Sequence, residues 1–193
     1  MNWTGMMAEF AFVLVVSAAF MPICRGWRLL PVLVAGIAVF TGFSGMLRAV
    51  FGDLSAASMV AAIWFIVRSV VGFRDRGELS RFFRLIFITA LPLYFTSLTG
   101  IGPDLYALGF GAWWYVVIIG IVGLWAVMLD SWLIGLWLAS GLFLTAVDLG
   151  ESSNVWDSLV DAPAAAVGLI TWVVFGVSRL RADGKWCFVE RSV

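Results

Sequence analysis

The apolar segment from Gly111 to Gly150 leaves this chain few ways to fold, because its only charged residue before Asp148 is Asp130. A helix crosses a bilayer core of about 30 Å with about 20 residues, so this segment of about 40 residues is long enough for two crossings. Asp130 and Ser131 divide it near its middle. We therefore predict two membrane helices, 111–129 and 131–149, that form a close antiparallel hairpin turning at Asp130.

The rest of the chain has the same apolar character. Its 193 residues are 63% hydrophobic and 12% charged, with a mean hydropathy of +1.04, whereas soluble domains average about 45–50% apolar and 25% charged residues. Apolar runs continue from end to end, so we predict one all-α domain over residues 1–193, a polytopic integral membrane helical bundle. Seven transmembrane helices are expected, at about 6–24, 29–47, 54–73, 85–101, 111–129, 131–149 and 162–178.

The basic residues orient this bundle, since cytoplasmic loops of membrane proteins are enriched in Lys and Arg. With the N-terminus outside and the C-terminus in the cytoplasm, all but one of the 12 basic residues fall on the inner side. The exception is Arg48. We expect a multi-pass protein of the cell (inner) membrane that retains its first helix, because no basic segment precedes the first apolar run. Cys24 and Cys187 fall on the reducing side, so no disulfide is expected.

Small residues spaced four apart recur in the predicted spans, and such residues let membrane helices approach closely. We interpret these pairs as packing within the chain rather than as a dimer face. They are Ala38/Gly42, Ala57/Ala61, Ser58/Ala62, Gly135/Ala139 and Ala164/Gly168. Most tryptophans fall at the two predicted boundaries, where indole rings prefer to lie. Trp64, Trp137 and Trp172 lie deeper.

The chain contains no histidine, so it cannot itself supply a Ser-His-Asp triad, a Cys-His pair or histidine ligands to zinc or haem. It also lacks the glycine-rich phosphate-binding motifs of nucleotide enzymes. The glycine-rich loop 99–111 is expected either to line a cavity or to form a simple turn. We expect no cofactor, no resident metal and no nucleic-acid partner, and the sequence leans away from an enzyme.

The predicted outer face gathers the acidic residues around the lone outer cation. Carboxylates grouped in this way can coordinate a hard cation or attract a cationic substrate, although outer loops that simply lack Lys and Arg would look the same. If the linker before the last span is helical, Asp157 and Asp161 share one face of it. The candidate ligand-binding residues are Arg48, Asp53, Asp104, Asp148, Glu151 and Asp161.

The predicted inner face has a basic loop between the third and fourth spans. Arginines at this depth attract anionic lipid headgroups, and we predict headgroup contacts for Arg74, Arg76, Arg81 and Arg84. Arg68 lies near the inner end of the third span, where its guanidinium can reach the interface.

These features favour a non-catalytic subunit or scaffold of a membrane assembly, because ionisable residues within the spans are scarce. The expected partners are membrane lipids and either another membrane protein or further copies of this chain. A small transporter or channel is the alternative, and it would need a polar path through the bundle. A membrane-embedded enzyme acting on a lipid-linked or phosphorylated substrate at the outer face is the third possibility.

Overall fold

The computed structural model describes residues 3–20, 54–72, 77–111, 113–148 and 152–182, with isolated positions between 33 and 49. Within these ranges the chain is all-helical, as predicted, and its sole β-type contact is an isolated antiparallel bridge between Phe110 and Asn154. The second predicted span, 29–47, lies mostly outside the described residues.

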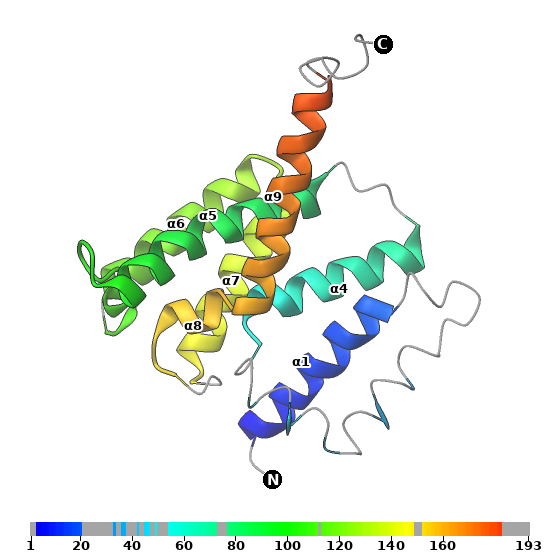
Figure 1. Ribbon diagram of the computed structural model, residues 1–193. Helices are drawn as coiled ribbons and strands as arrows, with labels where there is room; N and C mark the ends of the chain where they lie inside the picture. Colours follow the sequence, from blue (N-terminus) through cyan, green and yellow to red (C-terminus); the bar gives the residue numbers. More distant parts are fainter. Residues whose placement is uncertain are drawn as a thin grey trace.

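The described helices follow the predicted spans, with shifted ends (Figure 1). Their bounds are α1 Trp3–Phe20, α4 Ala56–Val71, α5 Glu78–Thr99, η1 Ala107–Gly109, α6 Trp113–Met128, α7 Trp132–Ala146, α8 Val155–Leu159 and α9 Ala162–Ala182. The structure differs from the predicted spans at two places. The basic segment expected as a loop is already helical from Glu78, and the acidic linker contains the short helix α8, which the sequence analysis did not predict.

The early start of α5 has a local cause. Glu78 lies in its first turn, where a negative side chain favours the positive end of the helix dipole, and Gly77 precedes it with a left-handed backbone. Phe82 and Ile86 then face the core while Arg81 is exposed. The amphipathic pattern therefore extends the helix through Arg81 and Arg84, which lie before the predicted start of the span at 85.

The hairpin predicted at Asp130 is confirmed. Helix α6 ends at Met128, α7 begins at Trp132, and Asp130 adopts a left-handed backbone with φ of 56°, which aspartate tolerates better than most residues. The backbone N–H of Ser131 donates to the carbonyl of Ala126 at 2.8 Å and closes the turn. Gly135 of α7 packs against Val127 and the carbonyl oxygen of Gly123 in α6.

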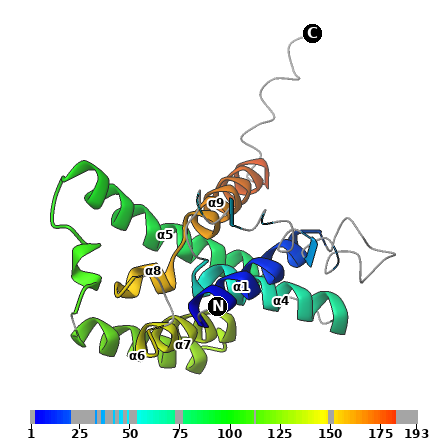
Figure 2. The ribbon, with the colours of Figure 1, turned by 90° about the horizontal axis from the view of Figure 1, so that it is seen from below.

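The core lies where α4, α5, α7 and α8 meet (Figures 1 and 2). Phe82 of α5 is fully buried and packs edge-on against Trp137 of α7, with ring centroids 5.6 Å apart. Small residues of α4, including Ala56, Ala57 and Ala61, line the same core. Trp137, one of the deeper tryptophans, is thus a core residue, whereas Trp172 is half exposed.

Helices α5 and α9 cross each other at close range. Gly168 of α9 lies against the backbone of Phe83 and the side chain of Phe87, so a methyl group there would overlap the Phe83 carbonyl oxygen. As predicted, Gly168 and Gly135 serve packing within the chain. Figures 1 and 2 show α9 running across α5 and continuing beyond the other helices.

Only α5 and α9, among the described helices, are both long and apolar enough to cross a membrane. Helices α4, α6 and α7 are apolar but shorter, with 16, 16 and 15 residues, which corresponds to about 24 Å or less. The seven-span arrangement is therefore not confirmed. What holds is a helical bundle with two helices of membrane-spanning length.

Helix ends meet at two places in the described part of the bundle. The start of α4 contacts the start of α9, and the loop after α5 contacts α8. At the opposite end, Glu78 and Arg81 of α5 lie beside Ser131 of the α6–α7 turn around a small crevice, and Arg84 of α5 reaches Phe175 of α9. We name these two ends of the bundle the acidic end and the basic end.

Candidate functional site at the acidic end

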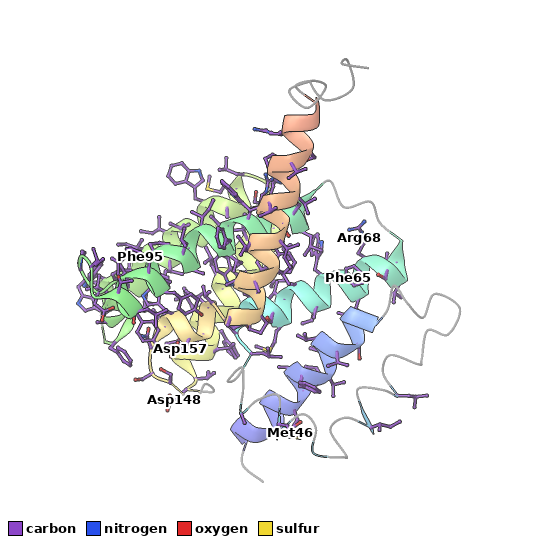
Figure 3. All side chains as sticks on the ribbon, viewed as in Figure 1. Met46, Phe65, Arg68, Phe95, Asp148 and Asp157 are labelled. Atoms are coloured by element: carbon purple, nitrogen blue, oxygen red, sulfur yellow. The ribbon has the colours of Figure 1, made fainter. Side chains whose placement is uncertain are left out.

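The predicted outer site is described at three of its six positions: Asp104, Asp148 and Asp161. Arg48, Asp53 and Glu151 lie outside the described residues. The three described carboxylates have different surroundings, since Asp161 is only 5% exposed while Asp104 and Asp148 lie on the surface. Figure 3 shows Asp148 near the margin of the molecule.

Asp161 is the centre of a buried polar network that joins two helices. Its Oδ2 accepts hydrogen bonds from the backbone N–H and the hydroxyl of Ser55, at 2.8 and 3.0 Å. Its Oδ1 accepts from the hydroxyl of Ser58 at 2.9 Å and from the backbone N–H of Ala164 at 2.7 Å. Both oxygens are therefore occupied by donors of the protein itself, so the carboxylate has little remaining capacity for an external ligand.

The position of Asp161 also has an electrostatic reason. It directly precedes α9 and caps its first turn through Ala164, while Ser55, its partner, caps α4 by accepting from the N–H of Ala57 at 3.1 Å. Helix N-termini carry unsatisfied N–H groups and a partial positive charge. One carboxylate thus faces the positive ends of two helices, which offsets the cost of burying its charge.

The carbonyl of Leu159 extends this network to α7. The indole N–H of Trp137 donates to it at 2.7 Å, and the hydroxyl of Ser55 lies 3.3 Å from the same oxygen. Trp137 and Leu159 are both buried. The network therefore connects the starts of α4 and α9 with the core of α7, and we name it the Asp161 network: Ser55, Ser58, Trp137, Leu159, Asp161 and Ala164.

A second cluster fixes the loop after α5 against α8. Asn154 is completely buried, caps α8 by accepting from the N–H of Trp156 at 3.0 Å, and donates to the carbonyl of Tyr106 at 3.0 Å. The indole N–H of Trp156 donates to the carbonyl of Leu105 at 3.1 Å. Gly109 leaves the space for this contact, because a Cβ there would overlap Oδ1 of Asn154.

The same loop contributes an aromatic hydroxyl to an acidic side chain. The phenol of Tyr106 lies 2.7 Å from each carboxylate oxygen of Asp157. Burial and this hydrogen bond raise the pKa of Tyr106 from 10.0 to about 12, because both favour the neutral, donating form. These hydrogen bonds hold the glycine-rich loop against α8.

Asp104 and Asp148, the other two described residues of the predicted site, lie in turns. Asp104 accepts from the backbone N–H groups of Tyr106 and Ala107 at 3.0 and 3.1 Å and so shapes the turn before η1. Asp148 lies in the turn after α7 with φ of 52°. The suggested helical pair of Asp157 and Asp161 is wrong, because α8 ends at Leu159 and Asp161 caps the next helix instead.

Within the described ranges no three acidic or cysteine side chains are grouped so that they would hold a metal ion. Among the three described residues of the predicted site, Asp104 and Asp161 accept hydrogen bonds from backbone N–H groups of the chain itself. The hydrogen bonds of Asp161 tie the starts of α4 and α9 together.

Sequence reasoning missed the partners of Asp161. Ser55 was not singled out, although a serine just before an apolar run is a typical N-cap signal. Asp161, followed by Pro163 in the first turn of α9, carries the same kind of signal. Asn154 was missed as well, and it precedes α8 as an N-cap. Local capping rules therefore identify these residues as helix caps. They do not predict that Ser55 and Asp161 contact each other across the bundle.

At the basic end, Arg81 and Arg84 lie on α5, whereas Arg74 and Arg76 lie outside the described residues. Arg68 is in the last turn of α4, where its charge complements the helix dipole, and its side chain extends away from the helix axis (Figure 3). Arg68, Arg81 and Arg84 thus lie near helix ends.

No protein-family model, curated protein or solved structure matches this chain.

Proposed function

We propose that this chain is a multi-pass protein of the cell membrane that serves as a non-catalytic subunit or scaffold of a membrane assembly. The observation that supports it best is the exposure of the apolar helices. Only 22% of the apolar window of α5 and 11% of that of α9 is buried within the chain. A core helix of a soluble protein would be mostly covered, and faces of this size need lipid or a partner protein.

Helix α6 supports the same proposal. It is the most apolar of the described helices, and most of its side chains face outward. Trp113 is 75% exposed and Trp125 is 63% exposed. These two tryptophans lie near opposite ends of the helix, as expected for indole rings at the two interfaces of a membrane.

In this proposal the chain crosses the membrane seven times, with the N-terminus outside and the acidic end on the outer side. The helices of 15 or 16 residues fall short of the bilayer core by about 6 Å or more, a mismatch that local thinning of the bilayer accommodates. Lipids contact the apolar faces, and the basic end lies on the inner side.

The scaffold reading rests on how the polar groups are used. Asp104, Asp157 and Asp161 each already accept hydrogen bonds from the chain. Two surface grooves, of about 370 and 380 Å³, lie along α5–α9 and along α4–α7, and apolar side chains line most of both. A transporter needs a polar path instead, so we rank it second.

Single-cysteine labelling tests the membrane arrangement. In a background with Cys24→Ser and Cys187→Ser, a cysteine at Ser152 should react with an impermeant maleimide added to intact cells, and one at Ser80 should react only after the membrane is opened. Both positions are half-buried in the structure, so they form a matched pair. Labelling of position 152 from the cytoplasmic side alone would overturn the orientation.

Purification in mild detergent tests the scaffold role. A stoichiometric membrane-protein partner, or a defined homo-oligomer, should remain bound and appear as one species in native mass spectrometry. A monodisperse monomer that takes up a solute in proteoliposomes would favour the transporter instead.

A further inference from the structure

Two arginines at the basic end share one aromatic ring. The guanidinium carbon of Arg84, on α5, lies 3.8 Å from the centroid of the Phe175 ring, on α9. That of Arg179, one turn further along α9, lies 4.4 Å from the same centroid. Both distances fall within the range of cation–π contacts. The ring therefore holds two like charges from two different helices close together.

Most of the donors on these arginines are not used within the described part of the chain. A guanidinium has five N–H groups in a fixed fork. Nε of Arg84 donates to the carbonyl of Ser80 at 3.3 Å, and no described carboxylate forms an ion pair with Arg84 or Arg179. Two neighbouring cations repel each other, so an anion bound beside them at the edge of the ring would stabilise the arrangement.

The surroundings indicate what kind of anion fits. Trp172 and Val174, close to Phe175 on α9, are 50% and 62% exposed, and Ile88, one turn after Arg84 on α5, is 55% exposed. Apolar side chains thus border the two arginines on the side toward the middle of the helices. This combination of an anion site and an adjoining apolar surface matches a lipid, whose phosphate lies at the interface and whose chains cover the helices.

We infer that Arg84, Phe175 and Arg179 form a binding site for the phosphate group of an anionic lipid. The fork of each guanidinium can donate two parallel hydrogen bonds to phosphate oxygens. Phe175 holds both forks in place before the ligand arrives, which lowers the entropy lost on binding. The site rests on the proposed membrane location and adds Phe175 and Arg179, neither of which the sequence pattern singled out.

Arg81 provides a matched control. It lies on the same helix, three residues before Arg84, and is exposed, but it makes no contact with the Phe175 ring. General attraction to a negative surface would depend on Arg81 about as much as on Arg84. Binding at a specific site would instead depend on Arg84, Arg179 and the Phe175 ring.

The test uses delipidated full-length protein in an uncharged detergent. Short-chain phosphatidylglycerol, short-chain phosphatidylcholine and inorganic phosphate are titrated separately, and binding is followed by the shift in the thermal unfolding midpoint. Phosphatidylglycerol should raise the midpoint of the parent protein. R84Q and R179Q should each weaken its binding by about tenfold or more, which corresponds to about 1.4 kcal/mol, while R81Q should change it by less than about threefold. F175L, which keeps both charges, should also weaken binding.

Equal losses in R81Q and R84Q would overturn the site, and so would equal binding of phosphatidylcholine. A midpoint shift produced by inorganic phosphate at the same concentrations would identify free phosphate as the ligand and refute the lipid. Circular dichroism checks that each variant folds. If R84Q does not fold, R84K replaces it, since it keeps the charge but loses the planar fork.

These measurements are made in detergent and do not depend on which way the protein faces in the membrane. If cysteine labelling places Ser80 outside while R84Q still loses lipid binding, the orientation is wrong and the site stands. If labelling agrees with the proposed topology while R84Q and R81Q behave alike, the site is wrong and the topology stands.

Discussion

Ser55 and Asp161, 106 positions apart in the chain, are joined by two hydrogen bonds to one carboxylate oxygen, at 2.8 and 3.0 Å. Each residue precedes a helix, α4 for Ser55 and α9 for Asp161. The contact therefore fixes two helix starts against each other. In a lipid environment, where burial of apolar surface does not draw helices together, such polar contacts have a larger share in the packing.

Replacing Asp161 by asparagine should destabilise the protein by about 1.5–3 kcal/mol, the usual range for hydrogen bonds to a charged group. The asparagine side chain has one acceptor oxygen in place of two, and its NH₂ group would face donors such as Ser58 or Ala164. Thermal unfolding in a fixed detergent, followed by circular dichroism, measures the loss.

The control for this experiment is Asp104→Asn. Asp104 is exposed and shapes a turn that asparagine also favours, so the change should stay within about 0.5 kcal/mol. Similar losses for both variants would show that Asp161 has no special place in the fold.

Raising the pH should weaken the contact between the loop after α5 and α8. The folded pKa of Tyr106 is raised from 10.0 to about 12 by burial and by Asp157, so between these values the folded state retains a proton that the unfolded chain releases. The stabilisation is complete below about pH 10 and is lost as the pH rises toward 12. Tyr106→Phe should remove this part of the alkaline loss, which is measured by unfolding at a series of pH values and by the absorbance of tyrosinate.

Replacing Gly109 by alanine should detach the loop after α5 from α8 without any rise in pH. A Cβ at position 109 would overlap Oδ1 of Asn154 and lie 2.5 Å from Cδ1 of Trp156, so Gly109→Ala should make residues 100–111 more accessible to protease. Gly120→Ala is the control, because the nearest atom to its Cβ would be Cδ1 of Leu142 at an ordinary 3.8 Å. Equal cleavage of the two variants would refute the tight fit around Asn154.

The helical fold was readable from the sequence because apolar runs and turn residues are local signals. Asp130 between two long apolar runs predicted the α6–α7 hairpin. Helix ends were less accurate, since α5 begins at Glu78 through amphipathic residues that an average hydropathy does not detect. Helix α4 ends at Val71, before the predicted end of its span at 73, because Gly72 caps it with a left-handed backbone.

The site was less predictable, because its contacts are long-range. Asp161 was among the predicted residues, but for a ligand rather than for Ser55 and Ser58, and nothing local specifies that pairing. The cluster at Phe175 was missed for the same reason. Two arginines far apart in the chain gain a shared ring only once α5 and α9 have crossed.

Helix α9 has two described glycines, Gly168 and Gly176, and the crossing of α5 and α9 should depend only on Gly168. A Cβ at position 168 would overlap the carbonyl oxygen of Phe83 and lie 2.8 Å from Cβ of Phe87, whereas a Cβ at Gly176 would meet nothing within 4 Å. Gly168→Ala should therefore force the helices apart and destabilise the protein by about 1–3 kcal/mol. Gly176→Ala should leave stability unchanged or raise it by up to about 1 kcal/mol, since alanine favours a helix more than glycine. Unfolding of both variants in the same detergent measures the difference, and a Gly168→Ala protein as stable as the parent would show that α5 and α9 do not pack in the way described.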